Sequence, residues 1–271
     1  MNVWWLLPIL HFVFLTTSFV SGYIIIVAKN LTDPFLPFIS DGGAFLPQSA
    51  IFGQLLNIAS ALLVLVVLAK FKQIKSFLMY ANSRAVWNYL NFISMLLGLI
   101  TAMGMSLIAN FQEYSLPVTH LIGALFTIIG GFIYILINLA FYIKFRTRLN
   151  SPCLMIFRIV LAAIHGIFLI VHIVSLTTMI FVRKHDETMT IMTEDVVQIE
   201  RYDSNSPFYC RHLLQTISEW ILVYAMEIHF LTYVADYKLY STSMFKTEYV
   251  ADDSCFDITL TEDAFDGYHQ Q

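Results

Sequence analysis

Long, nearly unbroken apolar segments dominate this chain of 271 residues. A helix needs about 20 apolar residues to cross the ~30 Å hydrocarbon core of a bilayer. The segments do not alternate between apolar and polar positions over ~10 residues, as the strands of a membrane β-barrel do. The sequence therefore predicts an all-α integral membrane protein, a bundle of six transmembrane helices. The predicted spans are residues 3–28, 51–69, 85–109, 116–143, 153–182 and 213–235.

The composition agrees with this interpretation. Hydrophobic residues make up 58% of the chain and charged residues 13%, and the mean hydropathy is +0.71. A soluble domain carries roughly a quarter charged residues, so too little polar surface remains here to cover a globule in water. The first segment has a long apolar core and no basic residues before it, which favours a membrane helix over a cleavable signal peptide. We expect the lipid bilayer as partner, and no nucleic acid.

The charges of the loops predict the orientation in the membrane. The loop from 70 to 84 and the one after residue 143 contain basic residues and no acid, and short loops of this kind stay in the cytosol. The loop from 29 to 50 has one lysine against two aspartates. Both termini are therefore expected in the cytosol, and the acidic segment 238–271 is expected to be a disordered cytosolic tail. The basic loop residues are Lys70, Lys72, Lys75, Arg84, Lys144, Arg146 and Arg148.

Signatures of catalysis were sought and not found. The sequence has no G-x-S-x-G, no H-E-x-x-H, no paired cysteines and no phosphate-binding glycine loop. We therefore predict no catalytic residue, no cofactor, no metal site and no enzyme activity. Asn30 begins the single N-x-S/T sequon, on the non-cytosolic side, and is a candidate for glycosylation.

Two segments outside the cytosol are unlike ordinary loops. The first runs Asp33-Pro-Phe-Leu-Pro-Phe-Ile-Ser-Asp-Gly-Gly43, in which the prolines forbid a helix and the aromatic residues would be costly in water. We expect Phe35, Phe38 and Ile39 to pack on the helix ends, and Asp41 to form a turn. The second segment, 104–120, joins two predicted helices with almost no slack.

These segments and the helix that contains Ser218-Glu219-Trp220 carry a family resemblance. The runs PFLPFISDGG…IFG, ANFQE…PVTH and SEW occur in the order and spacing of the damage-regulated autophagy modulator (DRAM) family, within the wider FRAG/DRAM/SFK-type superfamily. The resemblance covers residues 33–237. Its motif positions, candidates for a functional role, are Pro34, Pro37, Ser40, Asp41, Gly53, Asn110, Phe111, Gln112, Glu113, His120, Glu219 and Trp220.

The resemblance implies a protein that modulates autophagy from lysosomal or endosomal membranes through protein or lipid contacts, with the plasma membrane as second location. Three alternatives stay open: a plasma-membrane organiser of lipid-kinase signalling, a factor that remodels GPI-anchor lipids, and a transporter of small solutes or protons. Two departures bear on function. Leu46-Pro47-Gln48 and Leu121 stand where family members often carry Pro-Pro-Glu and an aspartate.

Ionisable residues inside predicted spans are costly and need partners. Arg158, His165 and His172 recur every seventh residue on one helix face, and Glu219 and Glu227 lie on the next helix. Their depths in the membrane predict that His172 pairs with Glu219, and that Arg158 or His165 pairs with Glu227. Such pairs act either as a static clamp or as a proton sensor, because histidine titrates near ~6.5.

Small residues recur every fourth position in two of the spans. We expect these stripes to pack helices within one chain, with a homodimer seam as the alternative. Asn57 and Asn91 are expected to form hydrogen bonds between helices. The stripes are Ser94, Gly98, Ala102 and Ser106 in the third span, and Ser49, Gly53, Asn57 and Ala61 in the second.

Overall fold

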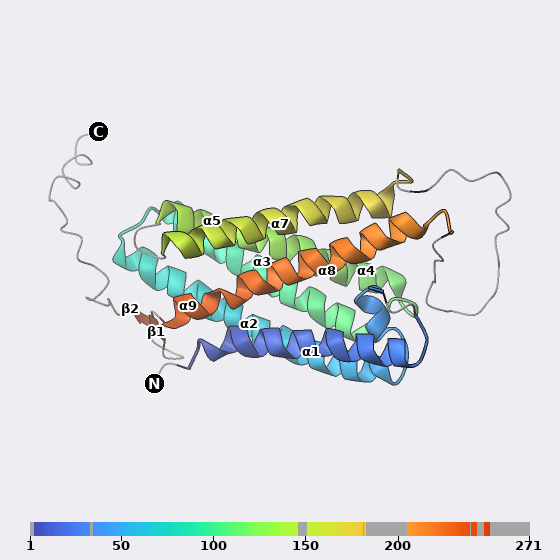
Figure 1. Cartoon of the computed structure of the whole chain (residues 1–271). Coiled ribbons are helices and arrows are strands. Elements are labelled where there is room, and N and C mark those ends of the chain that lie inside the picture. Colours follow the sequence, from blue (N-terminus) through green and yellow to red (C-terminus); the bar gives the residue numbers. More distant parts are fainter. Residues whose placement is uncertain are drawn as a thin grey trace.

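The structure is a computed structural model that describes most of the chain as a bundle of long helices with a small hairpin (Figure 1). The predicted tail and the loop from 183 to 212 lie mostly outside the described residues, as does Pro34. The described residues are 3–32, 35–145, 151–180, 182, 205–238, 240–242 and 247–249.

The long helices run alternately up and down the bundle (Figure 1). We call the end that holds the 3-10 turn η1 the cap end, and the end where α1 begins and α9 ends the terminus end. The helices α4, η2 and α5 follow one another without a break, and η2 is a π-helix. The elements are α1 (Leu6–Ala28), η1 (Ser40–Gly43), α2 (Gln48–Tyr80), α3 (Ala85–Asn110), α4 (Pro117–Leu125), η2 (Phe126–Gly130), α5 (Gly131–Lys144), α7 (Pro152–Thr177), α8 (Tyr209–Leu231) and α9 (Tyr233–Lys238).

Local sequence explains where several helices begin and end. Asn30 and Asn82 adopt positive φ angles of 55° and 43° just after α1 and α2. Asparagine tolerates this left-handed conformation, which lets the following N–H groups bond to the last carbonyls of the helix. Pro117 and Pro152 occupy first helical turns, where a missing N–H is harmless. Ser151 caps α7 by accepting the Leu154 N–H at 3.3 Å.

Within the described residues, five helices are long and apolar enough to cross a membrane. They are α1, α2, α3, the continuous helix Pro117–Lys144 and α7, which confirms a multi-pass helical membrane fold. The sixth helix, α8, packs mainly along α7 and is not among these five. Its buried face is polar, which lowers its hydropathy. The buried polar residues of α8 are Gln215, Thr216, Ser218, Glu227 and His229.

Three predicted boundaries differ from the structure. Helix α2 continues to Tyr80, so the predicted loop from 70 to 84 is wrong for most of its length, and Lys70 is buried inside the bundle. Helix α7 ends at Thr177 rather than at residue 182. Within the predicted disordered tail, β1 (Tyr240–Thr242) and β2 (Thr247–Tyr249) form an antiparallel hairpin that contacts α2.

The small-residue stripes pack within the chain, as expected. A Cβ atom on Gly53 of α2 would lie 2.5 Å from the carbonyl oxygen of Ala109 in α3. Ser106 of α3 donates a hydrogen bond to Asn57 of α2 at 3.0 Å. The Asn91 side chain donates to the Phe71 carbonyl at 3.0 Å, so the predicted interhelical role of both asparagines is confirmed.

The contact at Gly53 yields a test of this packing. Gly53→Ala should lower the free energy of unfolding in detergent by about 1–3 kcal/mol, because the new methyl group overlaps backbone that cannot move aside. Gly166→Ala is the matched control, since its methyl group would meet only the ring of Phe132, a side chain that can shift. Thermal unfolding of the two purified variants measures the difference. Equal stabilities would contradict the close approach of α2 and α3.

Candidate functional site

The loop between α1 and α2 folds back over the helix ends as a cap, residues 35–47. Asp41 is buried and its Oδ2 accepts the Phe38 N–H at 3.0 Å, which confirms its predicted role in the turn. A Cβ atom on Gly22 of α1 would lie 2.8 Å from the Gly42 oxygen, so the turn rests directly on α1. The remaining oxygen of Asp41 lies 3.3 Å from the Tyr114 hydroxyl, which can donate to it.

The predicted packing of the cap residues holds only in part. Ile39 is 7% exposed, and Phe38 is half-buried with its ring edge-on to His212. Phe35 is 62% exposed, so the prediction was wrong for this residue. The next buried residue after Phe35 is Pro37, so Phe35 lies just before the buried part of the cap.

The cap is fastened to α8 by the Ser218-Glu219-Trp220 motif. Glu219 Oε2 accepts the Ile39 N–H at 2.9 Å, and the Trp220 indole N–H donates to the Pro37 carbonyl at 2.8 Å. The predicted pair of Glu219 with His172 is therefore wrong. Ser218 faces α7 instead, with its Oγ 3.0 Å from Nδ1 of His172.

The second motif segment closes the other side of the cap end. His120 Nδ1 lies 2.8 Å from the Phe111 carbonyl, so this nitrogen carries the hydrogen. Asn110 donates to Asn57 at 3.0 Å, and the Gln112 carbonyl accepts two backbone N–H groups at the turn into α4. Glu113 lies in this turn with one buried oxygen that has no hydrogen bond to the described residues. The motif segments therefore meet in space.

A cavity of about 60 Å³ lies directly beneath the cap, between α1, α2, α3, α4 and α8. Its walls are mostly apolar, and the ionisable residues among them are Glu219, Glu227 and His120. The π-helix η2 forms part of the wall, and π-bulges occur frequently at functional sites. The lining residues are Leu15, Phe19, Ile39, Ser40, Phe52, Leu56, Met105, Ile108, His120, Ala124, Thr127, Ile128, Glu219, Val223, Met226 and Glu227.

Glu227 pairs with His11 of α1, at 2.7 Å between Oε2 and Nε2. Both side chains are fully buried. The prediction that Glu227 pairs with Arg158 or His165 is wrong, because α1 rather than α7 lies against this face of α8. His165 stacks on the ring of Phe132, with centroids 5.0 Å apart. The partner His11 was missed, although a histidine within an apolar segment was a usable signal.

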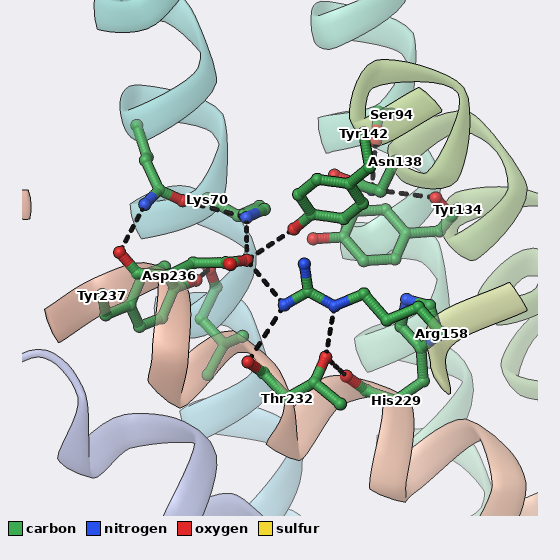
Figure 2. Close-up of polar contacts among 12 residues, drawn as sticks. Lys70, Ser94, Tyr134, Asn138, Tyr142, Arg158, His229, Thr232, Asp236 and Tyr237 are labelled. Atoms are coloured by element: carbon green, nitrogen blue, oxygen red, sulfur yellow. Dashed lines mark hydrogen bonds and ion pairs between the residues drawn. The ribbon is translucent and has the colours of Figure 1, made fainter. Parts of the chain in front are cut away.

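At the terminus end, a second polar site surrounds Asp236 of α9 (Figure 2). Its Oδ2 atom accepts from Lys70 Nζ at 2.5 Å, from Tyr142 at 2.5 Å and from Arg158 Nη2 at 2.9 Å. Arg158 also donates to the side chain and carbonyl of Thr232, where α8 breaks into α9. The Arg158 guanidinium lies 4.2 Å from the centre of the Tyr142 ring. We call Lys70, Tyr142, Arg158 and Asp236 the buried charge cluster.

The charges in this cluster determine how Asp236 titrates. Burial raises the pKa of the Asp236 carboxyl, but the adjacent Arg158 and Lys70 outweigh burial and hold the pKa below its ordinary value. Asp236 is therefore ionised at neutral pH in the folded protein, despite its burial. The sequence missed this cluster because Lys70 was assigned to a loop and Asp236 to the boundary of the tail.

The polar groups at the cap end and those of the buried charge cluster can both bind protons and join helices. In the part of the chain that the structure covers, no group of three or more His, Cys, Asp or Glu side chains is arranged to hold a metal ion. Asn30 is exposed at the end of α1, and its glycosylation stays a prediction.

Apolar helices of spanning length, a folded cap and charges paired inside the bundle together define a multi-pass membrane protein. Residues 3–239 match the model of the Frag1/DRAM/Sfk1/Cwh43P N-terminal domain. The chain belongs to this family, which confirms the resemblance of its motifs.

Relatives within the family carry autophagy in their names. Human DNA damage-regulated autophagy modulator protein 2 is 27% identical over 242 residues, which is 87% of each chain. The human protein 1 of that name is 27% identical over 233 residues, covering 85% of this chain and 90% of the relative. Modulator of macroautophagy TMEM150B from Xenopus tropicalis is 37% identical over 137 residues, or 49% and 56% of the two chains. No solved structure matches the chain.

The buried charge cluster yields a stability prediction. Asp236→Asn should destabilise the detergent-purified protein by about 3–5 kcal/mol, because it leaves two buried cations without their counter-charge. Adding Lys70→Met should recover part of this loss, since one of those cations is then removed. Chemical unfolding of the single and double variants measures the coupling.

Lys75→Met serves as the control for this cycle, because Lys75 lies on the same helix but is exposed. It should leave the stability within ~0.5 kcal/mol of the parent. Strictly additive losses for Asp236→Asn and Lys70→Met would contradict the buried ion pair.

Proposed function

We propose that this protein is a non-enzymatic modulator of autophagy that acts from lysosomal or endosomal membranes through contacts of its cap with a protein or lipid partner. Membership of the family and the names of the relatives support the role in autophagy. The observation that carries the proposal is the convergence of the three motif segments on one cap, fastened to α8 by Glu219 and Trp220.

The surface of the cap end supports a role in contacts. Large apolar side chains stand exposed there, namely Phe35 at 62%, Leu46 at 79% and Val118 at 70%. Exposed apolar groups at the edge of a membrane protein favour contact with lipid headgroup regions or with another protein. The polar face of the cap is turned inward, where Asp41 and Glu219 bond to backbone groups and hold its shape.

The proposal includes a topology of six crossings with α8 as the sixth. Helix α8 packs along α7, and α1 begins at the end of the bundle where α9 ends (Figure 1). The basic residues Lys72, Lys75 and Lys144 lie toward that terminus end, which supports a cytosolic location for it. The cap then faces the lumen or the cell exterior.

This topology can be tested with epitopes. Tags placed after Asn2 and after Tyr268 should both become accessible to antibodies when only the plasma membrane is opened. A tag after Asn205 should stay protected inside the organelle, because it lies at the cap end. Protection of either terminal tag under these conditions would contradict the topology.

The functional test uses the contact between cap and α8. In cells that lack the protein, the re-expressed parent should raise autophagic flux and coincide with lysosomal markers. Trp220→Phe should support less flux, because it removes the hydrogen bond to Pro37, worth about 1 kcal/mol, and loosens the cap. Flux and location are measured together in the same cells.

Trp87→Phe is the matched control, since Trp87 contacts the rings of Phe141 and Phe145 at the other end of the bundle. It should support flux like the parent protein. Unchanged flux on removal and return of the protein would contradict a role in autophagy. Steady-state location at the cell surface would instead favour the alternative of a plasma-membrane organiser of lipid kinases.

A further inference from the structure

The contact between His11 and Glu227 requires a particular number of protons on the two side chains. His11 Nδ1 lies 2.8 Å from the carbonyl oxygen of Ala59, which can only accept a hydrogen bond. Nδ1 must therefore carry a hydrogen. The other ring nitrogen, Nε2, lies 2.7 Å from Glu227 Oε2. If His11 were neutral and Glu227 ionised, both of these atoms would be acceptors, and nothing would join them.

One additional proton resolves this conflict. It lies either on Nε2, which gives an imidazolium beside a carboxylate, or on Oε2, which gives a neutral imidazole beside a carboxylic acid. Both arrangements hold the same number of protons and form the same hydrogen bond. Both also give the pair a net charge of zero, which suits its complete burial.

The cavity beside the pair can hold water molecules but brings no further counter-charge to it. Glu227 is fully buried and is one of the residues that line the cavity, and its Oε1 atom has no hydrogen bond to the described residues. A water molecule needs roughly 10–15 Å³ of such volume, so a cavity of about 60 Å³ has room for about four. An apolar ligand of benzene size needs ~150 Å³ and would not fit.

Few other titratable groups face the pair. Glu219 of α8 and His120 of α4 also line the cavity, and Tyr224 of α8 interacts electrostatically with Glu227. On α2 the group in contact is the Ala59 carbonyl, and α3 and η2 contribute Met105, Ile108, Thr127 and Ile128. Within the described residues, Lys and Arg side chains are absent from the cavity wall.

We propose that His11 and Glu227 together form a binding site for one proton, and that this proton joins α1 to α8. The site also includes α2 through the Ala59 carbonyl, so three helices meet at it. Loss of the proton at raised pH leaves two acceptors 2.7 Å apart in a buried setting, which drives α1 away from α8. The inference does not rest on the proposed function, since it concerns the purified protein alone.

The variant Glu227→Gln tests the site with little change of shape. Its amide can donate an N–H to Nε2 of a neutral His11, so the contact forms without the additional proton. In lipid nanodiscs, the melting temperature of the parent should fall by about 5 °C more than that of Glu227→Gln between roughly pH 6 and 9. Lys75→Met, the exposed control on α2, should keep the steeper dependence of the parent. A parent curve no steeper than that of Glu227→Gln overturns the proposal.

A second measurement decides the matter even if Glu227→Gln does not fold. Nuclear magnetic resonance of the parent with ring-labelled histidine reports protonation at each nitrogen, and His11→Gln identifies the His11 signal. At neutral pH the spectrum should show Nδ1 of His11 protonated and a proton shared between Nε2 and Glu227. A neutral His11 whose Nε2 lacks any hydrogen-bonded proton overturns the proposal.

Discussion

The bundle depends on one constraint, that polar groups carried into a low-dielectric interior must find partners within the protein. Helix α8 and the short α9 bring the largest set of such groups. Their partners come from different elements: the cap for Glu219, α7 for Ser218, α1 for Glu227, and α2 together with α7 for Asp236. Because each of these groups bonds to a different element, α8 determines how the other elements pack around it.

The arrangement also links the two ends of the molecule. At the cap end, Glu219 and Trp220 hold the backbone of the loop between α1 and α2. At the terminus end, Arg158 bonds to the carbonyl of Thr232, at the junction of α8 and α9. Glu227 stands between Glu219 and Thr232 along α8, so the His11–Glu227 pair lies between these sites. Movement of α8 would therefore disturb the cap and the buried charge cluster together.

The sequence predicted the parts of this fold that follow from hydropathy. Membrane helices, the turn at Asp41 and the interhelical roles of Asn57 and Asn91 came from local pattern and residue chemistry. The partners of the buried charges did not, because depth along a helix does not say which neighbour faces a given side chain. Glu227 was assigned to α7, yet its face of α8 meets α1.

Hydropathy also misplaced residues at the terminus end. Lys70 and Asp236 were assigned to solvent because charged residues usually mark the end of a span, whereas here each neutralises the other inside the bundle. The same effect lowers the hydropathy of α8 relative to the five apolar helices. A central helix that carries paired charges is therefore harder to recognise from sequence than the lipid-facing helices that surround it.

The central claim is that α8 crosses the membrane as the polar centre of the bundle, and labelling of single cysteines tests it most directly. After Cys153, Cys210 and Cys255 are replaced by serine, one cysteine is placed at Asn205 and, separately, one at Lys238; both positions are exposed. In sealed vesicles of one orientation, a membrane-impermeant reagent should label one of these positions from outside and the other only after the vesicles are opened. Labelling of both positions from the same side would show that α8 does not cross, and would contradict the account.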